Sequence, residues 1–296
     1  MTSLVIGLGS MGLGAAASLL RAGLPVVGMD LNSTARDKFS ALGGTSTDSL
    51  ADVSQISNAF IFVVNAKQAE TVIFETGLLD KLAPNATVIN CVTLAPSIAI
   101  DIAARVNARG FGYLDAPVSG GAAKAMSGEM SIMASGAPEA FERTQTVLDA
   151  ISAKVFTLGD QAGNGSKMKL VNQLLAGVHI AAAAESLNLA AKMDMDLHEV
   201  IDVISHCAGT SWMFENRGPH IADGDYSPLS TVDIFVKDMG IVTGEAAHIG
   251  ATTPLSEAAQ SLYQAASNLG LGQEDDSAVV KLLAQQSNTT LPGSGQ

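Results

Sequence analysis

Three glycines near the N-terminus constrain the fold of this 296-residue chain more than any other feature. In the segment VIGLGSMGLG, Gly7, Gly9 and Gly12 follow a short apolar run with the spacing G-x-G-x-x-G. Glycines at this spacing permit a tight turn from a strand into a helix and let a pyrophosphate approach the helix N-terminus. Because glycines occur in turns of many kinds, the motif predicts a dinucleotide-binding unit only if strands and helices continue to alternate.

The next 150 residues do alternate in this way. Buried strands are predicted where short apolar runs occur, and the segments between them carry apolar residues at helical spacing. The predicted strands lie at 4–9, 25–30, 59–64, 87–92 and 112–117, with two further strands at 129–136 and 154–159. This order is typical of an α/β fold, here a Rossmann-type doubly wound parallel sheet with helices on both faces.

The pattern changes after residue 162. From Gly163 onward the chain is almost purely helical, beginning with the long Ala-rich segment SKMKLVNQLLAGVHIAAAAE. We therefore predict a Rossmann domain at 1–162 and an all-α domain at 163–296, linked by a long helix that both share. The second domain is expected to serve substrate binding and oligomerisation, with the substrate in an interdomain cleft, where small-molecule sites are common.

An acidic residue ends the second predicted strand, 18 positions after Gly12. The carboxylate of Asp30 can accept hydrogen bonds from the adenosine ribose and repels a 2′-phosphate, and no arginine follows until Arg36. A structural turn followed by a solvated aspartate is the simpler alternative. Taken together, the motif and Asp30 favour NAD over NADP. The predicted binding loop consists of Gly7, Leu8, Gly9, Ser10, Met11 and Gly12.

A Ser-Gly-Gly sequence is the candidate binding site for an anionic substrate. In LDAPVSGG, Ser119 is followed by Gly120 and Gly121 at the end of a predicted strand. The backbone N–H groups of such a turn can cradle a carboxylate. On spacing alone, an ordinary turn explains these residues equally well.

A lysine and two amides share one face of the long helix. Lys169, Asn172 and Gln173 stand at i, i+3 and i+4, which places them on the same side. Without other context, a solvated lysine near a helix start is the simpler interpretation. The same is true of Lys237 and Asp238, which could form a surface ion pair beside an apolar helix.

The order of these motifs is similar to that of the β-hydroxyacid dehydrogenases, the 3-hydroxyisobutyrate dehydrogenase-like family. The motifs are GLGxMG, DAPVSGG, GxGxxxKxxN and a Lys-Asp pair, and they span nearly the whole chain. Within the family, segments such as SWMFENR, DGDYSP and VDIFVKD resemble the L-threonate dehydrogenases. The resemblance implies NAD-dependent oxidation of a small hydroxy acid. L-threonate is the leading substrate, and 3-hydroxyisobutyrate and tartronate semialdehyde are alternatives. A non-catalytic NAD(H) sensor is the alternative from another class.

The resemblance also implies roles for individual residues. Lys169 matches the catalytic lysine, which as a neutral amine can accept the substrate's hydroxyl proton. The implied substrate-binding residues are Ser119, Gly120, Gly121 and Asn172, and Asn65, Thr93 and Lys237 are implied to contact the cofactor. Three positions depart from the common family pattern. Gln173 stands where a second Asn is frequent, Asn65-Ala66 stands where many members have a proline, and Val92 stands where many have Ser.

Composition limits the other ligands and partners. The net charge of −13 argues against nucleic acid and anionic membranes, and no uncharged apolar run approaches the roughly 18 residues of a membrane span. The five histidines show no metal-ligand spacing, so no metal is expected. Two distant cysteines, Cys91 and Cys207, favour the cytoplasm. Family members are commonly dimers or tetramers, so a homodimer or homotetramer is expected. The sequence assigns no ligand contact to Trp212 or Arg217.

Overall fold

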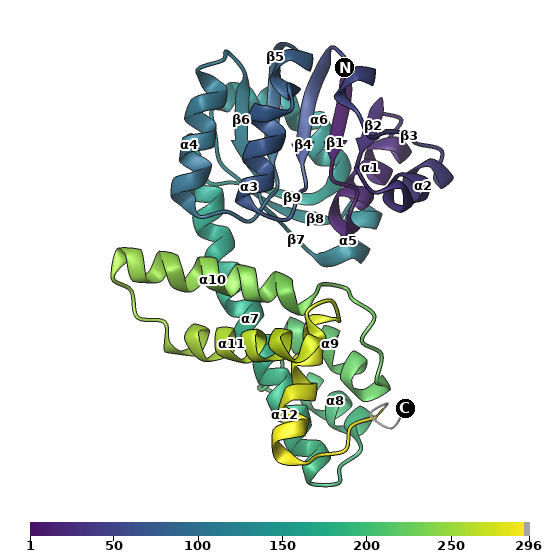
Figure 1. Ribbon diagram of the computed structural model, residues 1–296, viewed down its shortest axis with the longest axis vertical. Coiled ribbons are helices and arrows are strands. Elements are labelled where there is room, and N and C mark those ends of the chain that lie inside the picture. The colour runs from purple at the N-terminus through teal and green to yellow at the C-terminus, as the bar shows by residue number, and fades with distance from the viewer. Residues whose placement is uncertain (293–296) are drawn as a thin grey trace. The chain divides into compact units, whose positions relative to one another are not determined.

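The computed structural model describes residues 1–292, and the last four residues of the predicted second domain lie outside it. The chain folds into two compact units, Met1–Lys169 and the part that begins at Leu170. The division falls within helix α7 (Asn164–Lys192), a few residues beyond position 162. The first unit contains two hydrophobic clusters and the second contains one. Figure 1 shows the helices and strands of both units.

A six-stranded parallel sheet forms the centre of the first unit, in the order β3-β2-β1-β4-β5-β6. The order reverses between β1 and β4, and doubly wound sheets bind ligands at such a switch point. The glycine motif directly follows β1 and therefore lies there. The strands are β1 (Thr2–Ile6), β2 (Val26–Met29), β3 (Thr45–Thr47), β4 (Ile56–Ile61), β5 (Leu82–Asn90) and β6 (Gly112–Asp115).

Helices cover both faces of this sheet, as predicted (Figure 1). Along β1, Leu4 and Ile6 belong to the core layer that includes α4 (Pro96–Asn107), whereas Val5 belongs to the layer that includes α1 (Ser10–Arg21) and α6 (Pro138–Ile151). Because such strands are buried on both sides, they appear in the sequence as continuous apolar runs. The other helices of the unit are α2 (Ser33–Ala41), α3 (Ala66–Glu70), α5 (Gly121–Ser127) and the short turns Leu50–Asp52, Thr71–Glu75 and Leu78–Lys81.

The two further predicted strands form a second, smaller sheet instead of extending the first. They are β8 (Met130–Ala134) and β9 (Ser152–Thr157), which pair in parallel. A two-residue strand, β7 (Val118–Ser119), pairs antiparallel with β8. Neither β7 nor β3 is predicted from the sequence, because one is only two residues long and the other is a polar Thr-Ser-Thr run without an apolar pattern.

The second unit is helical, as predicted. After the remainder of α7, its helices are α8 (Leu197–Ser205), α9 (Trp212–Asp223), α10 (Val232–Ile249), α11 (Pro254–Ala266) and α12 (Val279–Ser287), with short turns at Ser267–Leu271 and Asp276–Ala278. Its core includes Ile180, Leu187, Phe235 and Tyr263, and the rings of Phe235 and Tyr263 stack at 5.3 Å. The tyrosine hydroxyl donates a 2.9 Å hydrogen bond to the Gly177 carbonyl of α7.

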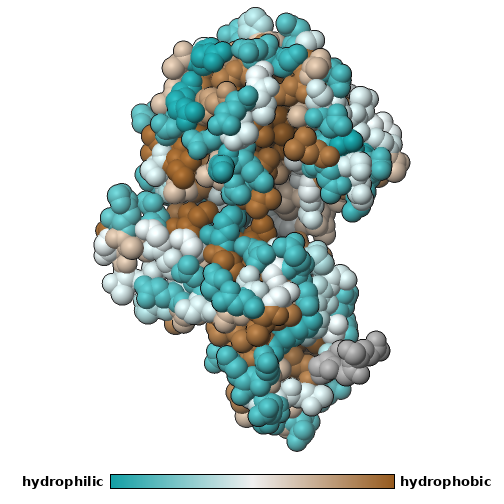
Figure 2. All heavy atoms as spheres, in the orientation of Figure 1, coloured by the Kyte–Doolittle hydropathy of each residue, from teal (hydrophilic) through white to brown (hydrophobic). Residues whose placement is uncertain are grey.

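Helix α7 also carries apolar side chains on its exposed side. Val171, Leu175, Leu189 and Met193 are each about half exposed or more, and they recur at intervals that keep them on one face. Figure 2 shows hydrophobic residues among hydrophilic ones on the visible surface of each unit. By length and hydropathy alone α7 could cross a membrane, but 44% of its most apolar window is buried within this chain, and core helices of soluble proteins pass the same test.

Candidate active site

The predicted glycine loop forms a tight turn between β1 and α1. Gly7 has a φ of +92°, and a side chain on Gly12 would lie 1.8 Å from the Gly7 carbonyl oxygen, so neither position accepts another residue without rearrangement. A Cβ on Gly9 would meet no atom within 4 Å. The first turn of α1 has no acidic residue and no side-chain cap. Its N-terminus therefore offers space and backbone N–H groups to an anion such as a pyrophosphate.

Asp30 is hydrogen-bonded to this turn. Its Oδ2 accepts a 2.7 Å bond from the Leu8 backbone N–H, and its Oδ1 accepts from Asn32. The nearest following arginine is already engaged, because the Arg36 guanidinium donates to the Asp30 carbonyl at 2.8 Å and pairs with Asp48 at 3.2 Å. The carboxylate thus fixes the loop while its oxygens keep further lone pairs that a ribose hydroxyl can use.

Asn65 and Thr93 follow two neighbouring strands of the same sheet, β4 and β5. Carboxyl ends of parallel strands meet at one edge, so both residues belong to the edge that carries the glycine loop. Asn65 is the N-cap of α3, and its side chain accepts a 3.0 Å hydrogen bond from the Gln68 N–H. A capping role therefore accounts for the Asn65 side chain without a ligand.

The Ser-Gly-Gly segment turns from β7 into α5. Gly120 and Gly121 both have positive φ, +128° and +73°, a conformation that side-chain-bearing residues rarely adopt. No side chain caps α5. Ser119 is partly exposed at the end of β7. Consecutive glycines in this geometry form a concave run of backbone that suits a carboxylate.

Lys169 lies beside this segment. Its ammonium group is almost buried, with the residue 8% exposed, and Nζ donates a 2.8 Å hydrogen bond to the Val118 carbonyl. Val118 immediately precedes Ser119. The structure thus brings the predicted proton acceptor and the predicted carboxylate cradle together within the first unit, and the interpretation of Lys169 as a solvated surface residue is wrong.

A buried carboxylate that we did not predict as part of the site holds the start of α7. Asp115, at the end of β6, accepts hydrogen bonds from the Gly163 N–H at 2.9 Å and from the N–H and hydroxyl of Ser166, both at 2.8 Å. Burial raises the pKa of the Asp115 carboxyl, and these hydrogen bonds oppose the shift. A Cβ on Gly165 would lie 2.5 Å from the Asp115 carbonyl oxygen, so only glycine permits this approach. Its signal in the sequence is an acidic residue that ends an apolar strand.

The amides on α7 belong to a second polar network, within the helical unit. Asn172 donates to Gln173 at 2.9 Å, and Gln173 donates to Asp238 at 2.6 Å. Lys237 Nζ lies 2.8 Å from the other oxygen of Asp238. This second contact is an ion pair without the geometry of a directed hydrogen bond. Asp238 is 2% exposed, so the pair is not the surface ion pair that the sequence allowed.

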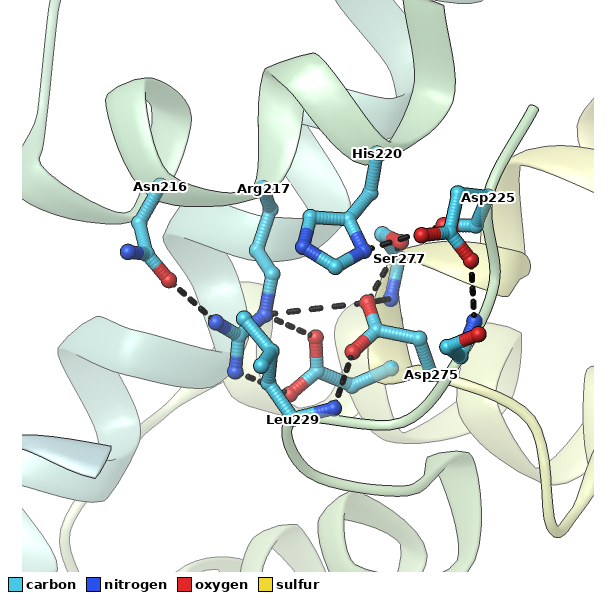
Figure 3. Close-up of polar contacts among 9 residues, drawn as sticks. Asn216, Arg217, His220, Asp225, Leu229, Asp275 and Ser277 are labelled. Atoms are coloured by element: carbon cyan, nitrogen blue, oxygen red, sulfur yellow. Dashed lines mark hydrogen bonds and ion pairs between the residues drawn. The ribbon is translucent and has the colours of Figure 1, made fainter. Parts of the chain in front are cut away.

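Arg217 lies in a separate buried cluster, shown in Figure 3. Its guanidinium donates two hydrogen bonds to Asp276, at 2.6 and 2.9 Å, and Nε is 3.8 Å from Asp275. Asp275 in turn accepts from the Leu229 N–H at 2.9 Å, which ties the loop before α10 to the turn before α12. A structural ion pair therefore accounts for Arg217. Trp212, at the start of α9, is half exposed.

Comparison with known proteins agrees with this architecture. Residues 3–159 match the family described as the NAD binding domain of 6-phosphogluconate dehydrogenase. Residues 163–283 match the family described as NAD-binding of NADP-dependent 3-hydroxyisobutyrate dehydrogenase. Together the two matches span most of the chain, and they confirm the predicted fold and a nicotinamide dinucleotide, NAD, as the cofactor.

Relatives match over nearly the full length. The chain is 48% identical to L-threonate dehydrogenase from Haemophilus influenzae, over 98% of this chain and 97% of that protein. It is 47% identical to L-threonate dehydrogenase from Escherichia coli K12, over 98% and 96%. The crystal structure of a 3-hydroxyisobutyrate dehydrogenase from Salmonella typhimurium has a TM-score of 0.91 and 46% identity, over 95% of this chain and 99% of that one. The chain therefore belongs to the NAD-dependent β-hydroxyacid dehydrogenases, the 3-hydroxyisobutyrate dehydrogenase-like family.

Proposed function

We propose that this enzyme oxidises L-threonate to its 2-oxo acid, 2-dehydro-L-erythronate, with NAD as the hydride acceptor. The observation that carries the chemistry is the hydrogen bond from Lys169 to Val118, which holds an amine beside the Ser119 segment. The choice of substrate is supported by full-length relatives at 47–48% identity that are named L-threonate dehydrogenase. The Salmonella structure is described as a 3-hydroxyisobutyrate dehydrogenase, so 3-hydroxyisobutyrate is the alternative substrate.

The chemistry of the side chains determines which residues we assign to substrate binding and which to proton transfer. Ser119, Gly120 and Gly121 bind the substrate carboxylate through the hydroxyl and backbone N–H groups. The neutral amine of Lys169 takes the proton of the reacting hydroxyl, and in reverse its ammonium returns that proton. Asn172, one helical turn further along α7, binds the substrate as well. Bound NAD accepts the hydride, so the protein's own task is to orient the substrate and move one proton.

We assign cofactor binding to the first domain, 1–162. The glycine loop Gly7–Gly12 receives the pyrophosphate and Asp30 the adenosine ribose, which favours NAD over NADP. Asn65, Thr93 and Lys237 contact the cofactor elsewhere. The helical domain, 163–296, completes the substrate site and carries self-association.

A homodimer or homotetramer is the proposed assembly. The support is the row of half-exposed apolar side chains on one face of α7, because exposed apolar stripes mark contact surfaces. The cytoplasm is the proposed compartment, supported by two cysteines that are not in a disulfide. Molar mass in solution, measured by light scattering, tests the assembly, and a monomer would contradict it.

The function is tested by NADH formation from a panel of L-threonate, 3-hydroxyisobutyrate, glycerate and 2-hydroxybutanoate. L-threonate should have the highest kcat/KM. A higher value for 3-hydroxyisobutyrate would establish the alternative. If no hydroxy acid yields NADH while the protein still binds NADH, the sensor hypothesis replaces both.

A further inference from the structure

We propose that Asp238 and Gln173 set the direction of the Asn172 amide, so that the enzyme selects acids with a second hydroxyl group. This inference rests on the proposed function, because it assumes that Asn172 contacts the substrate. It concerns Asp238 as a positioning residue and Gln173 as the link, and neither is among the residues assigned above to the substrate or the cofactor.

The first step is the direction of the Gln173 amide. The two ends of an amide side chain differ, since the oxygen only accepts hydrogen bonds and the nitrogen only donates them. A carboxylate also only accepts. The 2.6 Å contact between Gln173 and Asp238 therefore requires the Gln173 Nε2 end to face Asp238. Its Oε1 is then left to face Asn172.

The second step passes this direction to Asn172. Because Gln173 presents Oε1, Asn172 must supply an N–H, and the 2.9 Å contact joins these atoms. Among the described residues no group donates to Asn172 Oδ1. Asn172 thus keeps a carbonyl oxygen and one N–H for a ligand. This pair matches a hydroxyl, which both donates and accepts, whereas a carboxylate would be repelled by the oxygen.

The third step is the ion pair that keeps Asp238 in its place. Lys237 lies 2.8 Å from the Asp238 oxygen that Gln173 does not use. An ammonium requires an acceptor, so one oxygen is held toward Lys237 and the other toward Gln173. If residue 238 were asparagine, its oxygen would face Lys237 and its amide nitrogen would face Gln173. The Gln173 amide would then turn around, and Asn172 would lose its outward acceptor.

The substitution Asp238→Asn therefore tests the orientation of the Asn172 amide, because asparagine has nearly the same size and shape as aspartate. At saturating NAD, kcat/KM is measured for L-threonate and for 2-hydroxybutanoate of the same configuration at C2, which lacks the hydroxyls at C3 and C4. The wild type should prefer L-threonate by about tenfold or more, because sites built for a hydroxyl discriminate strongly against its absence. Asp238→Asn should reduce this ratio by about tenfold. Using a ratio cancels any change in cofactor binding through Lys237.

Three further variants are measured beside Asp238→Asn. Gln173→Met removes both hydrogen bonds at similar volume and should reduce the ratio as well. Gln260→Met removes another glutamine of the same unit, which accepts a 2.8 Å bond from Thr243, and it should leave the ratio unchanged. Adding Asp238→Asn to an Asn172→Leu variant should change the ratio no further, since the oriented amide is already gone.

The outcomes separate this inference from the proposed function. If the wild type oxidises hydroxy acids but Asp238→Asn and Gln173→Met both keep the wild-type ratio, the positioning role is wrong and the dehydrogenase function stands. If both variants lower activity on the two substrates equally, Asp238 is structural only. If the wild type forms no NADH from any hydroxy acid, the proposed function itself fails.

Discussion

Lys169 donates a 2.8 Å hydrogen bond to the backbone carbonyl of Val118, the residue before Ser119. The two residues are 51 positions apart, and a buried carboxylate makes the contact possible. Asp115 accepts from Gly163 and Ser166 at the start of α7, and one helical turn later the chain presents Lys169. The lysine is therefore held by the backbone on one side and by its own capped helix on the other.

Two substitutions of Lys169 should distinguish its role in proton transfer from the effect of its positive charge. Lys169→Ala should fold, bind NADH and lose about 10²–10⁴-fold in kcat, the usual contribution of general acid–base catalysis. Lys169→Arg keeps the charge but stays protonated at neutral pH, so it should be almost as inactive. Steady-state kinetics of both variants, with NADH affinity by fluorescence as the control, checks this. Substantial activity in Lys169→Arg would mean that positive charge alone suffices.

Asp30 should set the preference for NAD. Asp30→Ala should narrow the kcat/KM ratio of NAD to NADP by at least about tenfold, because like-charge contact with a 2′-phosphate costs several kcal/mol. The kcat/KM of the Asp30→Ala variant with NAD should also fall, since the Leu8 N–H loses its 2.7 Å acceptor. Asp30→Asn keeps an acceptor and should retain more NAD activity. A wild type that uses both cofactors equally would remove this role.

Asp115 should matter for stability and for catalysis together. Asp115→Ala leaves the buried N–H groups of Gly163 and Ser166 without an acceptor, at about 1–3 kcal/mol for each group. Urea unfolding should therefore show a loss of roughly 2–5 kcal/mol, and kcat should fall because the start of α7 is released. Asp115→Asn is the matched control: its oxygen can serve both N–H groups, and the Ser166 hydroxyl can turn to accept. An Asn variant as damaged as Ala would argue against this account.

The Arg217–Asp276 pair should give a recognisable pH dependence. Burial raises the pKa of Asp276 to about 6, against the opposing effect of Arg217, whereas the unfolded value is near 3.8. A raised carboxyl pKa means that the folded state binds more protons, so this group's contribution is fully present below about pH 4 and is lost as pH rises through about 6. The free energy of unfolding of the wild type, relative to that of Asp276→Asn, should therefore increase as pH falls from 7 to 4, by at most about 1.4 kcal/mol per pH unit.

Urea unfolding of both proteins across this range checks the sign. If the wild type instead loses stability relative to Asp276→Asn as pH falls, the ion pair with Arg217, and not burial of the carboxyl, has the larger effect on the pKa of Asp276.

Local sequence patterns were enough to predict the parallel sheet and the helices of the first domain. Strand runs, helical spacing and the glycine motif depend on neighbours within a few residues, and the packing of a parallel sheet leaves those patterns in the sequence. The spacing of Lys169, Asn172 and Gln173 likewise predicted that they share one helix face, because side chains three and four positions apart lie on the same side of a helix. The family's motif order then indicated which of these residues carry the chemistry.

Tertiary structure decided the contacts that give those residues their surroundings. Asp115 caps a helix that begins 49 positions later, Lys169 reaches a carbonyl 51 positions earlier, and Gln173 meets an aspartate 65 positions away. No local pattern encodes such pairs, because they form only when separate elements pack and bury their polar groups together. The buried Asp238 carboxylate accepts a hydrogen bond from Gln173, and we infer that this contact sets the direction of the Asn172 amide.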